Sequence, residues 1–289
     1  MTSEELLNKV RKIEIKTRGL SRNIFAGEYH SSFKGRGMAF SEVREYQPGD
    51  DVRSIDWNVT AKLNKPYIKV FEEERELTVM LLVDVSGSRN FGSATQLKRD
   101  MMAEIAATLA FSTIENNDKV GVLFFSDKIE KFIPAKKGKT HVLHIIRELL
   151  SFEPTSNGTD IAGALQYFTN AQKRRCTAFL ISDLLVPRVS NIEKPLLISA
   201  NRHDLNVIRV YDRRDEEMPD VGLLKLKDPE TGERIWIDSS VAHVREQYNN
   251  AQIKRKEAFA ELFTKTGTNS VSVRTDEDFV KALMLLFRK

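Results

Sequence analysis

The chain has 289 residues, of which 41% are hydrophobic and 30% are charged, enough for one large domain, or one large and one small. Its net charge of +4 is slight, so composition alone does not favour nucleic-acid binding. A single cysteine excludes an intrachain disulfide framework and fits a reducing compartment. We find neither a signal-peptide pattern nor a run approaching the ~20 apolar residues that span a bilayer. We therefore expect a cytoplasmic protein with no integral membrane segment.

Residues 1–76 are expected to form an N-terminal region of their own. Thr2 to Glu5 matches a capping box, and an apolar stripe after it predicts a helix that ends at Gly19. Residues 27–72 carry several glycines and prolines among short apolar runs. This composition favours loops with a few short strands.

Residues 77–289 are expected to form one larger domain in which strands alternate with helices. The predicted strands are 77–84, 119–126, 128–134, 177–183, 204–211 and 269–274. The predicted helices are 94–116, 139–151, 160–173, 189–200, 241–265 and 276–288. This alternation predicts an α/β fold with a doubly wound, mostly parallel sheet.

Two segments of this domain are expected to form antiparallel strand pairs. Because only Asp127 separates the strands at 119–126 and 128–134, this pair should be antiparallel and lie at an edge of the sheet. The stretch 221–238, with Asp-Pro-Glu-Thr-Gly at its middle, predicts an inserted β-hairpin.

An oxygen-rich turn follows the first strand of the larger domain. The apolar run 77–83 leads directly into Asp84, Ser86 and Ser88, spaced Asp-x-Ser-x-Ser. Carboxylate and hydroxyl oxygens suit Mg²⁺, which keeps positions open for water or a ligand. The order strand, turn, helix places this cluster at the carboxyl end of a strand, where open α/β sheets bind ligands.

Two later loops carry further oxygen ligands. The strand at 177–183 ends in Asp183, and Thr159 lies in a polar turn that opens the helix at 160–173. In a parallel sheet Asp183 would share an edge with the Asp84 turn, and Thr159 would lie on a neighbouring loop. Each residue also has a structural alternative, because Ser, Asp and Gly are ordinary turn residues and both Asp183 and Thr159 could cap a helix.

Taken together and in this order, the five positions resemble the metal-ion-dependent adhesion site of von Willebrand factor A domains. The resemblance implies a Rossmann-type sheet and one divalent cation, Mg²⁺ or Mn²⁺, held by Asp84, Ser86, Ser88, Thr159 and Asp183. Arg89 follows the serines directly. Its charge could repel a cation or attract a partner's carboxylate, and it would do neither if it pointed to solvent.

The segment from Arg44 to Asn58, with Pro66, Lys69 and the acidic run after it, resembles bacterial proteins of the family called domain of unknown function fifty-eight. The Asp-Pro-Glu-Thr-Gly-Glu stretch at 228–233 is similar to that family as well. This resemblance implies an adaptor or co-chaperone encoded beside a MoxR-type AAA+ ATPase, with no enzymatic activity.

The Arg44 to Asn58 motif has two interpretations. In the structural one, Arg53 and Asp56 form a charge-assisted bond and Trp57 anchors the region on the sheet. In the functional one, acids, bases and an aromatic residue form an interaction surface. The residues concerned are Arg44, Asp50, Asp51, Arg53, Asp56 and Trp57.

The function that the sequence favours is a metal-dependent protein-interaction module. Ser86, Ser88 and Thr159 would bind the cation directly, Asp84 and Asp183 would act partly through water, and an acidic residue of the ATPase or its client would complete the coordination. An alternative is a phosphatase-like hydrolase that uses the same ion as a Lewis acid, although no general base is evident in the sequence. Nucleic-acid binding, favoured only by the mild positive charge, would show steep salt dependence.

Overall fold

The computed structural model describes residues 38–73, 77–93, 96–186, 188–227 and 232–287. The chain divides into two compact units; among the described residues, those up to Leu77 belong to the smaller unit and those from Thr78 onward to the larger one. The helix predicted before Gly19 lies outside the described residues. Within them, no helix is long and apolar enough to cross a membrane.

The smaller unit is built on a two-stranded antiparallel sheet. Strand β1 (Met38–Glu45) pairs with β2 (Tyr67–Glu73). The connection holds a 3-10 turn, η1 (Val52–Ser54), and a short helix, α2 (Trp57–Leu63). The strands agree with the predicted loops and short strands, whereas α2 was not predicted.

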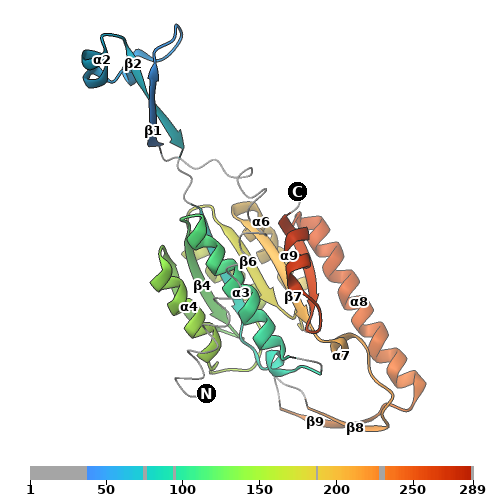
Figure 1. The fold of residues 1–289 in the computed structure, drawn as a ribbon. Coiled ribbons are helices and arrows are strands. Elements are labelled where there is room, and N and C mark those ends of the chain that lie inside the picture. The colour runs from blue at the N-terminus through green and yellow to red at the C-terminus, as the bar shows by residue number, and fades with distance from the viewer. Residues whose placement is uncertain (1–37, 74–76, 94–95, 187, 228–231, 288–289) are drawn as a thin grey trace. The chain divides into compact units, whose positions relative to one another are not determined.

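The larger unit contains a six-stranded sheet in the order β10-β7-β6-β3-β4-β5 (Figure 1). All neighbouring pairs are parallel except β4 and β5, which form the predicted antiparallel edge. The strands are β3 (Thr78–Asp84), β4 (Lys119–Phe125), β5 (Ile129–Lys136), β6 (Thr177–Ser182), β7 (Asp204–Tyr211) and β10 (Asn269–Arg274).

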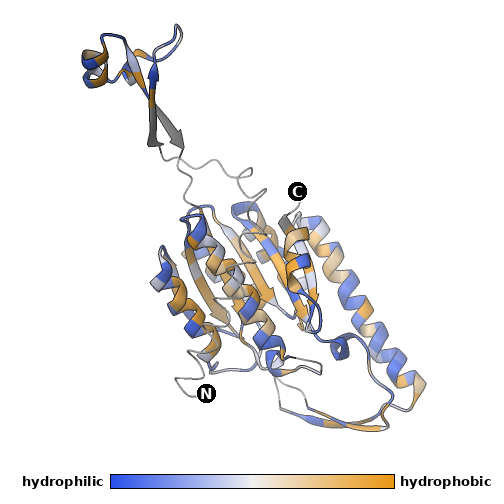
Figure 2. Ribbon diagram, in the orientation of Figure 1, coloured by the Kyte–Doolittle hydropathy of each residue, from blue (hydrophilic) through white to orange (hydrophobic). Residues whose placement is uncertain are grey.

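Helices cover both faces of this sheet, as the alternating side chains of β3 show. Leu81 and Val83 pack in one core cluster with α3, α4 and α9, while Met80 and Leu82 pack in a second with α5, α6 and α8. The helices are α3 (Lys98–Glu115), α4 (Lys139–Ser151), α5 (Ile161–Ala171), α6 (Ser190–Arg202), α8 (Ala242–Thr266) and α9 (Phe279–Phe287). In Figure 2 the central strands are predominantly hydrophobic, as burial on both faces requires. The predicted doubly wound sheet is therefore confirmed.

Three smaller elements lie outside the alternating pattern. The predicted hairpin is present as β8 (Leu223–Lys227) and β9 (Arg234–Asp238). Two short helices were not predicted: η2 (Gly87–Asn90), which follows β3, and α7 (Arg213–Glu216), which follows β7. In Figure 1 the hairpin and α7 lie at the same end of the larger unit.

Candidate functional site

Polar side chains end several strands of the sheet at its carboxyl edge. Asp84 ends β3, Asp183 follows β6, and Asp212 follows β7. The chain runs from β3 to β4 on one side, and β6 lies on the other side of β3. The strand order therefore reverses at β3, which is where open α/β sheets leave a crevice for ligands.

The turn after β3 draws its oxygen atoms together. The backbone N–H of Ser86 donates to Asp84 Oδ1 at 2.9 Å, and the hydroxyl oxygens of Ser86 and Ser88 lie 3.0 Å apart. All three side chains are at most 2% exposed. The sequence placed these residues on one turn, and the structure makes them a single buried cluster.

Asp183 joins this cluster from the neighbouring strand. The Ser182 hydroxyl, also from the end of β6, donates to Asp84 Oδ2 at 2.6 Å. Burial, together with the negative charge of Asp183, raises the pKa of Asp84 to about 6. The two buried carboxylates at the junction of β3 and β6 thus repel each other.

The loop that carries Thr159 is fastened to the Asp84 turn. The N–H of Gly87 donates to the Asn157 carbonyl at 2.9 Å, and Thr159 itself is half-buried. Asp160, not Thr159, caps α5 by accepting from Gly163 N–H. Helix α6 begins after Val189, so Asp183 is not its cap either. The helix-cap alternatives for Thr159 and Asp183 are therefore excluded.

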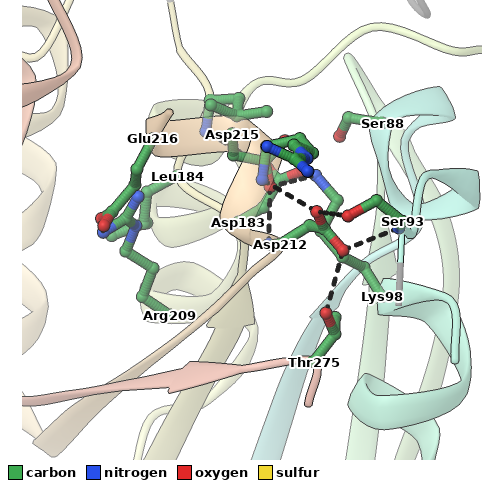
Figure 3. A network of polar contacts seen from close by, with 12 residues as sticks. Ser88, Ser93, Lys98, Asp183, Leu184, Arg209, Asp212, Asp215, Glu216 and Thr275 are labelled. Atoms are coloured by element: carbon green, nitrogen blue, oxygen red, sulfur yellow. Dashed lines mark hydrogen bonds and ion pairs between the residues drawn. The ribbon is translucent and has the colours of Figure 1, made fainter. Parts of the chain in front are cut away.

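Lys98, which was not predicted to be a site residue, lies at the centre of the site (Figure 3). Its ammonium group is 2.8 Å from Asp183 Oδ2 and 3.1 Å from Asp215 Oδ2, and the side chain is 0% exposed. Burial lowers the pKa of Lys98, but the charges of Asp183 and Asp215 outweigh this effect and raise it overall. A signal was present: Lys98 shares a helix face with buried Met101, Met102 and Ile105.

Asp215 links Lys98 to a second polar cluster at the end of β7. Asp212 N–H donates to Asp215 Oδ2 at 2.8 Å, which completes the capping box of α7. The Asp212 carboxylate accepts from the backbone and hydroxyl of Ser93 and from Thr275 Oγ1. The dashed contacts in Figure 3 follow this chain of interactions. The Asp-x-x-Asp spacing of a capping box was the available sequence signal.

Arg89 does not point to solvent. It is 9% exposed, and its Nη2 donates to the Phe152 carbonyl at 2.7 Å. Its Nε has no hydrogen-bond partner among the described residues. Burial lowers the pKa of Arg89, and the charge of Asp84 opposes that effect. The guanidinium is therefore held inside the protein by a backbone oxygen and feels the charge of the Asp84 cluster.

The donor set fits a hard divalent cation. Asp84, Asp183 and Asp215 outnumber the cations Lys98 and Arg89, so the buried cluster keeps a net negative charge. Its other donors are hydroxyl oxygens, which suit Mg²⁺ or Mn²⁺. In the described part of the chain no three His, Cys, Asp or Glu side chains are grouped to hold a metal. A cation here would consequently depend on the serine and threonine oxygens.

The Arg44 to Asn58 motif is arranged differently from the structural interpretation. Arg44 makes a two-pronged ion pair with Asp50, at 2.7 and 2.9 Å, and that hydrogen bond holds the pKa of Asp50 below its usual value. Asp56 caps α2 and lies 3.5 Å from Lys69. The expected Arg53–Asp56 bond is absent from the described contacts, and the Trp57 side chain is 70% exposed. The ion pairs of this motif therefore include Arg44–Asp50 and Asp56–Lys69.

The fold and these contacts define a class of protein: a doubly wound α/β domain with an Asp-x-Ser-x-Ser turn at the carboxyl edge of its sheet. Within that class, the chain belongs to the family described as "Protein of unknown function DUF58", whose model matches residues 42–258. It is 32% identical over 280 residues to the uncharacterized protein Rv1480 of Mycobacterium tuberculosis (strain ATCC 25618 / H37Rv), covering 96% of this chain and 87% of that protein. It is 27% identical to YeaD of Bacillus subtilis (strain 168) over 131 residues, 45% of this chain and 29% of that protein.

Solved structures offer more distant likenesses. BatB from Bacteroides thetaiotaomicron matches with a TM-score of 0.47 and 17% identity, over 73% of this chain and 96% of that one. A von Willebrand factor type A structure from Catenulispora acidiphila matches with a TM-score of 0.37 and 15% identity, over 50% and 35% of the two chains. Neither likeness is strong enough to assign a function to this chain.

Proposed function

We propose that this protein is a non-enzymatic, divalent-cation-dependent interaction module of the cytoplasm, working as an adaptor or co-chaperone of a MoxR-type AAA+ ATPase. The observation that carries the proposal is the convergence of Asp84, Ser86, Ser88 and Asp183 in one buried, net negative cluster where the strand order reverses. Membership of the DUF58 family supports it, because the sequence resemblance to that family implies such a partner.

Each residue of the site would have its own role in binding the cation. Ser86, Ser88 and Thr159 would hold Mg²⁺ or Mn²⁺ directly, and Asp84 and Asp183 would act partly through water. The bound ion would give a partner's carboxylate a stronger and more directional contact than a surface ion pair provides. Lys98 would hold Asp183 in place and balance part of the negative charge, so that the cluster stays folded when no cation is bound.

The alternative hydrolase finds less support in the contacts. The two cations beside the cluster are already engaged, Lys98 by two carboxylates and Arg89 by a backbone carbonyl. To stabilise the charge of a transition state, Lys98 or Arg89 would have to give up these contacts. Mg²⁺-dependent hydrolysis of p-nitrophenyl phosphate that disappears in a Ser86→Ala, Ser88→Ala variant would favour the hydrolase over the interaction module.

The cation is tested by thermal unfolding with and without Mg²⁺ or Mn²⁺. A cation at a hundred times its dissociation constant stabilises a protein by about 2.7 kcal/mol, so the wild type should melt at a higher temperature with the ion than with a chelator. The Ser86→Ala, Ser88→Ala variant should lose this difference and keep the metal-free midpoint. Ser151→Ala, at an exposed serine of α4, is the control. An equal metal response in all three proteins would refute the site.

The partner is tested by pull-down with purified MoxR-type ATPase in Mg²⁺ and in chelator. Because Asp183 is bonded to buried Lys98, its removal would disturb the fold, and the serine double variant is the cleaner probe. Binding that requires both Mg²⁺ and the two serines supports the adaptor. Binding that is indifferent to both would place the docking surface elsewhere.

A further inference from the structure

A cavity of about 430 Å³ opens beside the proposed cation site. Its polar wall consists of Ser88, Lys98 and Asp215, the last two bonded to each other. The rest of the wall is mostly apolar and comes from the loops after β3 and β6, the segment after α7, the hairpin and α8. These residues include Phe91, Leu185, Met218, Pro219, Leu224 and Leu226.

The β8–β9 hairpin turns one hydrophobic face toward this cavity. The register pairs Leu224 with Ile237 and Leu226 with Ile235, and side chains on a strand alternate between faces. Leu224 and Leu226 therefore lie on the cavity face. Leu223, on the opposite face, is 64% exposed and does not line the cavity.

The walls of the cavity are fastened to one another by hydrogen bonds. Tyr248 Oη donates to the Arg214 carbonyl at 3.0 Å, and Met218 N–H donates to Asn249 Oδ1 at 3.0 Å, which joins α7 and its following segment to α8. At the base of the hairpin, Ser239 N–H donates to the Gly222 carbonyl at 2.8 Å, and Arg245 of α8 pairs with Asp220 at 3.1 Å. The cavity is thus preformed in the folded chain.

The rim of the cavity is positively charged, which favours an acidic ligand. Arg214 and Lys227 are exposed cavity residues, and neither forms an ion pair with another residue that the structure describes. Lys98 and Asp215 balance each other within the wall. An apolar cavity with a positive rim, next to hydroxyls proposed to hold a cation, is complementary to a segment that is both acidic and hydrophobic.

We propose that the cavity is a second subsite for the protein partner, and that it receives a large apolar side chain next to the Asp or Glu that reaches the Ser86–Ser88 turn. This inference rests on the proposed function, because the acidic residue needs the cation there. It adds the chemistry of the partner: a short polypeptide segment in which Leu, Met or Phe lies within about two residues of a carboxylate, a separation of roughly 7 Å in extended chain.

The test is selection from a displayed library of random twelve-residue peptides against the immobilised full chain in Mg²⁺. Selected peptides should carry an acidic residue within two positions of a large apolar one, and one such peptide, resynthesised, should bind only with Mg²⁺. Leu226→Asn removes an apolar wall of the cavity and should weaken this binding about tenfold, because the apolar side chain of the peptide then loses part of the surface against which it is buried. The matched control Leu223→Asn, on the outer face of the same strand, should leave binding unchanged.

The outcomes separate this inference from the function on which it rests. Acidic, Mg²⁺-dependent peptides with no apolar preference, or equal binding by the two leucine variants, would overturn the subsite and leave the cation-dependent module standing. Apolar peptides that bind without an acid or Mg²⁺ would overturn the proposed function. Failure to enrich either feature would overturn both. Thermal midpoints of the two leucine variants, measured in parallel, show whether Leu226→Asn has unfolded the chain instead, and Leu224→Asn then takes its place.

Discussion

Lys98 carries a full positive charge to a position with no exposure to solvent, between Asp183 and Asp215. Taking an ammonium group out of water costs several kcal/mol, which only close opposite charges repay. Removing one member of such a buried pair leaves the other charge uncompensated. The stability of the sheet edge therefore depends on Lys98 whether or not a cation binds.

We predict that Lys98→Met lowers the free energy of unfolding by about 3–5 kcal/mol, measured by urea denaturation in the presence of chelator. The methionine retains the length of the side chain, so the loss reflects charge more than volume. Lys254→Met, at an exposed position of α8, should change the free energy by less than about 0.5 kcal/mol. Equal effects of the two substitutions would show that the buried ion pairs are not stabilising.

For single residues, the sequence was enough to predict the candidate cation ligands but not the charged side chains that pack around them. Asp84 and Asp183 could be placed because each ends an apolar run, and parallel strands bring such ends to one edge. Lys98 was missed despite the apolar residues on its helix face, since a lysine in the first turn of a helix is ordinarily solvated.

At the scale of elements, His203 closes helix α6 and joins it to two neighbours. Its N–H donates to the Ser199 carbonyl, its ring lies 4.5 Å from that of Phe168 in α5, and its Nδ1 is 3.4 Å from the sulfur of Cys176 at the start of β6. The side chain is buried, as is that of Cys176. Burial, with the charges of Arg202 and Arg175, lowers the pKa of His203 to about 4.

This histidine should make the protein acid-sensitive. The unfolded chain takes up the proton near pH 6.5 and the folded chain only near pH 4, so between these values the unfolded state binds more protons and stability falls as the pH falls. We predict that His203→Phe, which keeps a ring but cannot titrate, loses markedly less stability than the wild type between pH 7 and pH 4.5 in urea denaturation. His243→Phe, at an exposed histidine of α8, should behave as the wild type. Identical pH profiles for all three proteins would contradict the assignment.

Element length explains which secondary structure could be predicted. Strands buried on both faces and helices of nine or more residues, such as α9, show their periodicity over two or more turns and were found. The short helices η2 and α7, of four residues each, are too brief to show a period. Both nevertheless contribute to the site, because η2 carries Ser88 and α7 carries Asp215.

For the whole molecule, the part of the chain from Thr78 onward holds two extensive hydrophobic clusters. In the larger unit both faces of the sheet are covered by helices from that same unit. In the smaller unit, Ile68 of β2 is buried. Burial of apolar surface supplies most of the free energy of folding, so the larger unit should be the more stable one.

We predict that a fragment beginning at Leu77 folds by itself and retains the Mg²⁺-linked increase in melting temperature. Circular dichroism and thermal unfolding of this fragment, compared with the full chain, provide the measurement. A fragment that is unfolded or aggregates at once would show that the N-terminal residues are part of its core. A folded fragment without the metal response would assign part of the cation site to those residues.

Because β3 lies in the interior of the sheet, one of its edges stays unpaired until β6 has been synthesised. Strands β3, β4 and β5 follow one another along the chain, but β6 pairs with the other side of β3, and Ser182 reaches Asp84 from 98 residues away. At about 5–20 residues per second, a ribosome needs roughly 5–20 s to make that intervening stretch. During this time one edge of an apolar strand has no neighbour, and unpaired edges of this kind promote aggregation. The nascent chain is most in need of chaperone protection in the interval before its own ligand site can be completed.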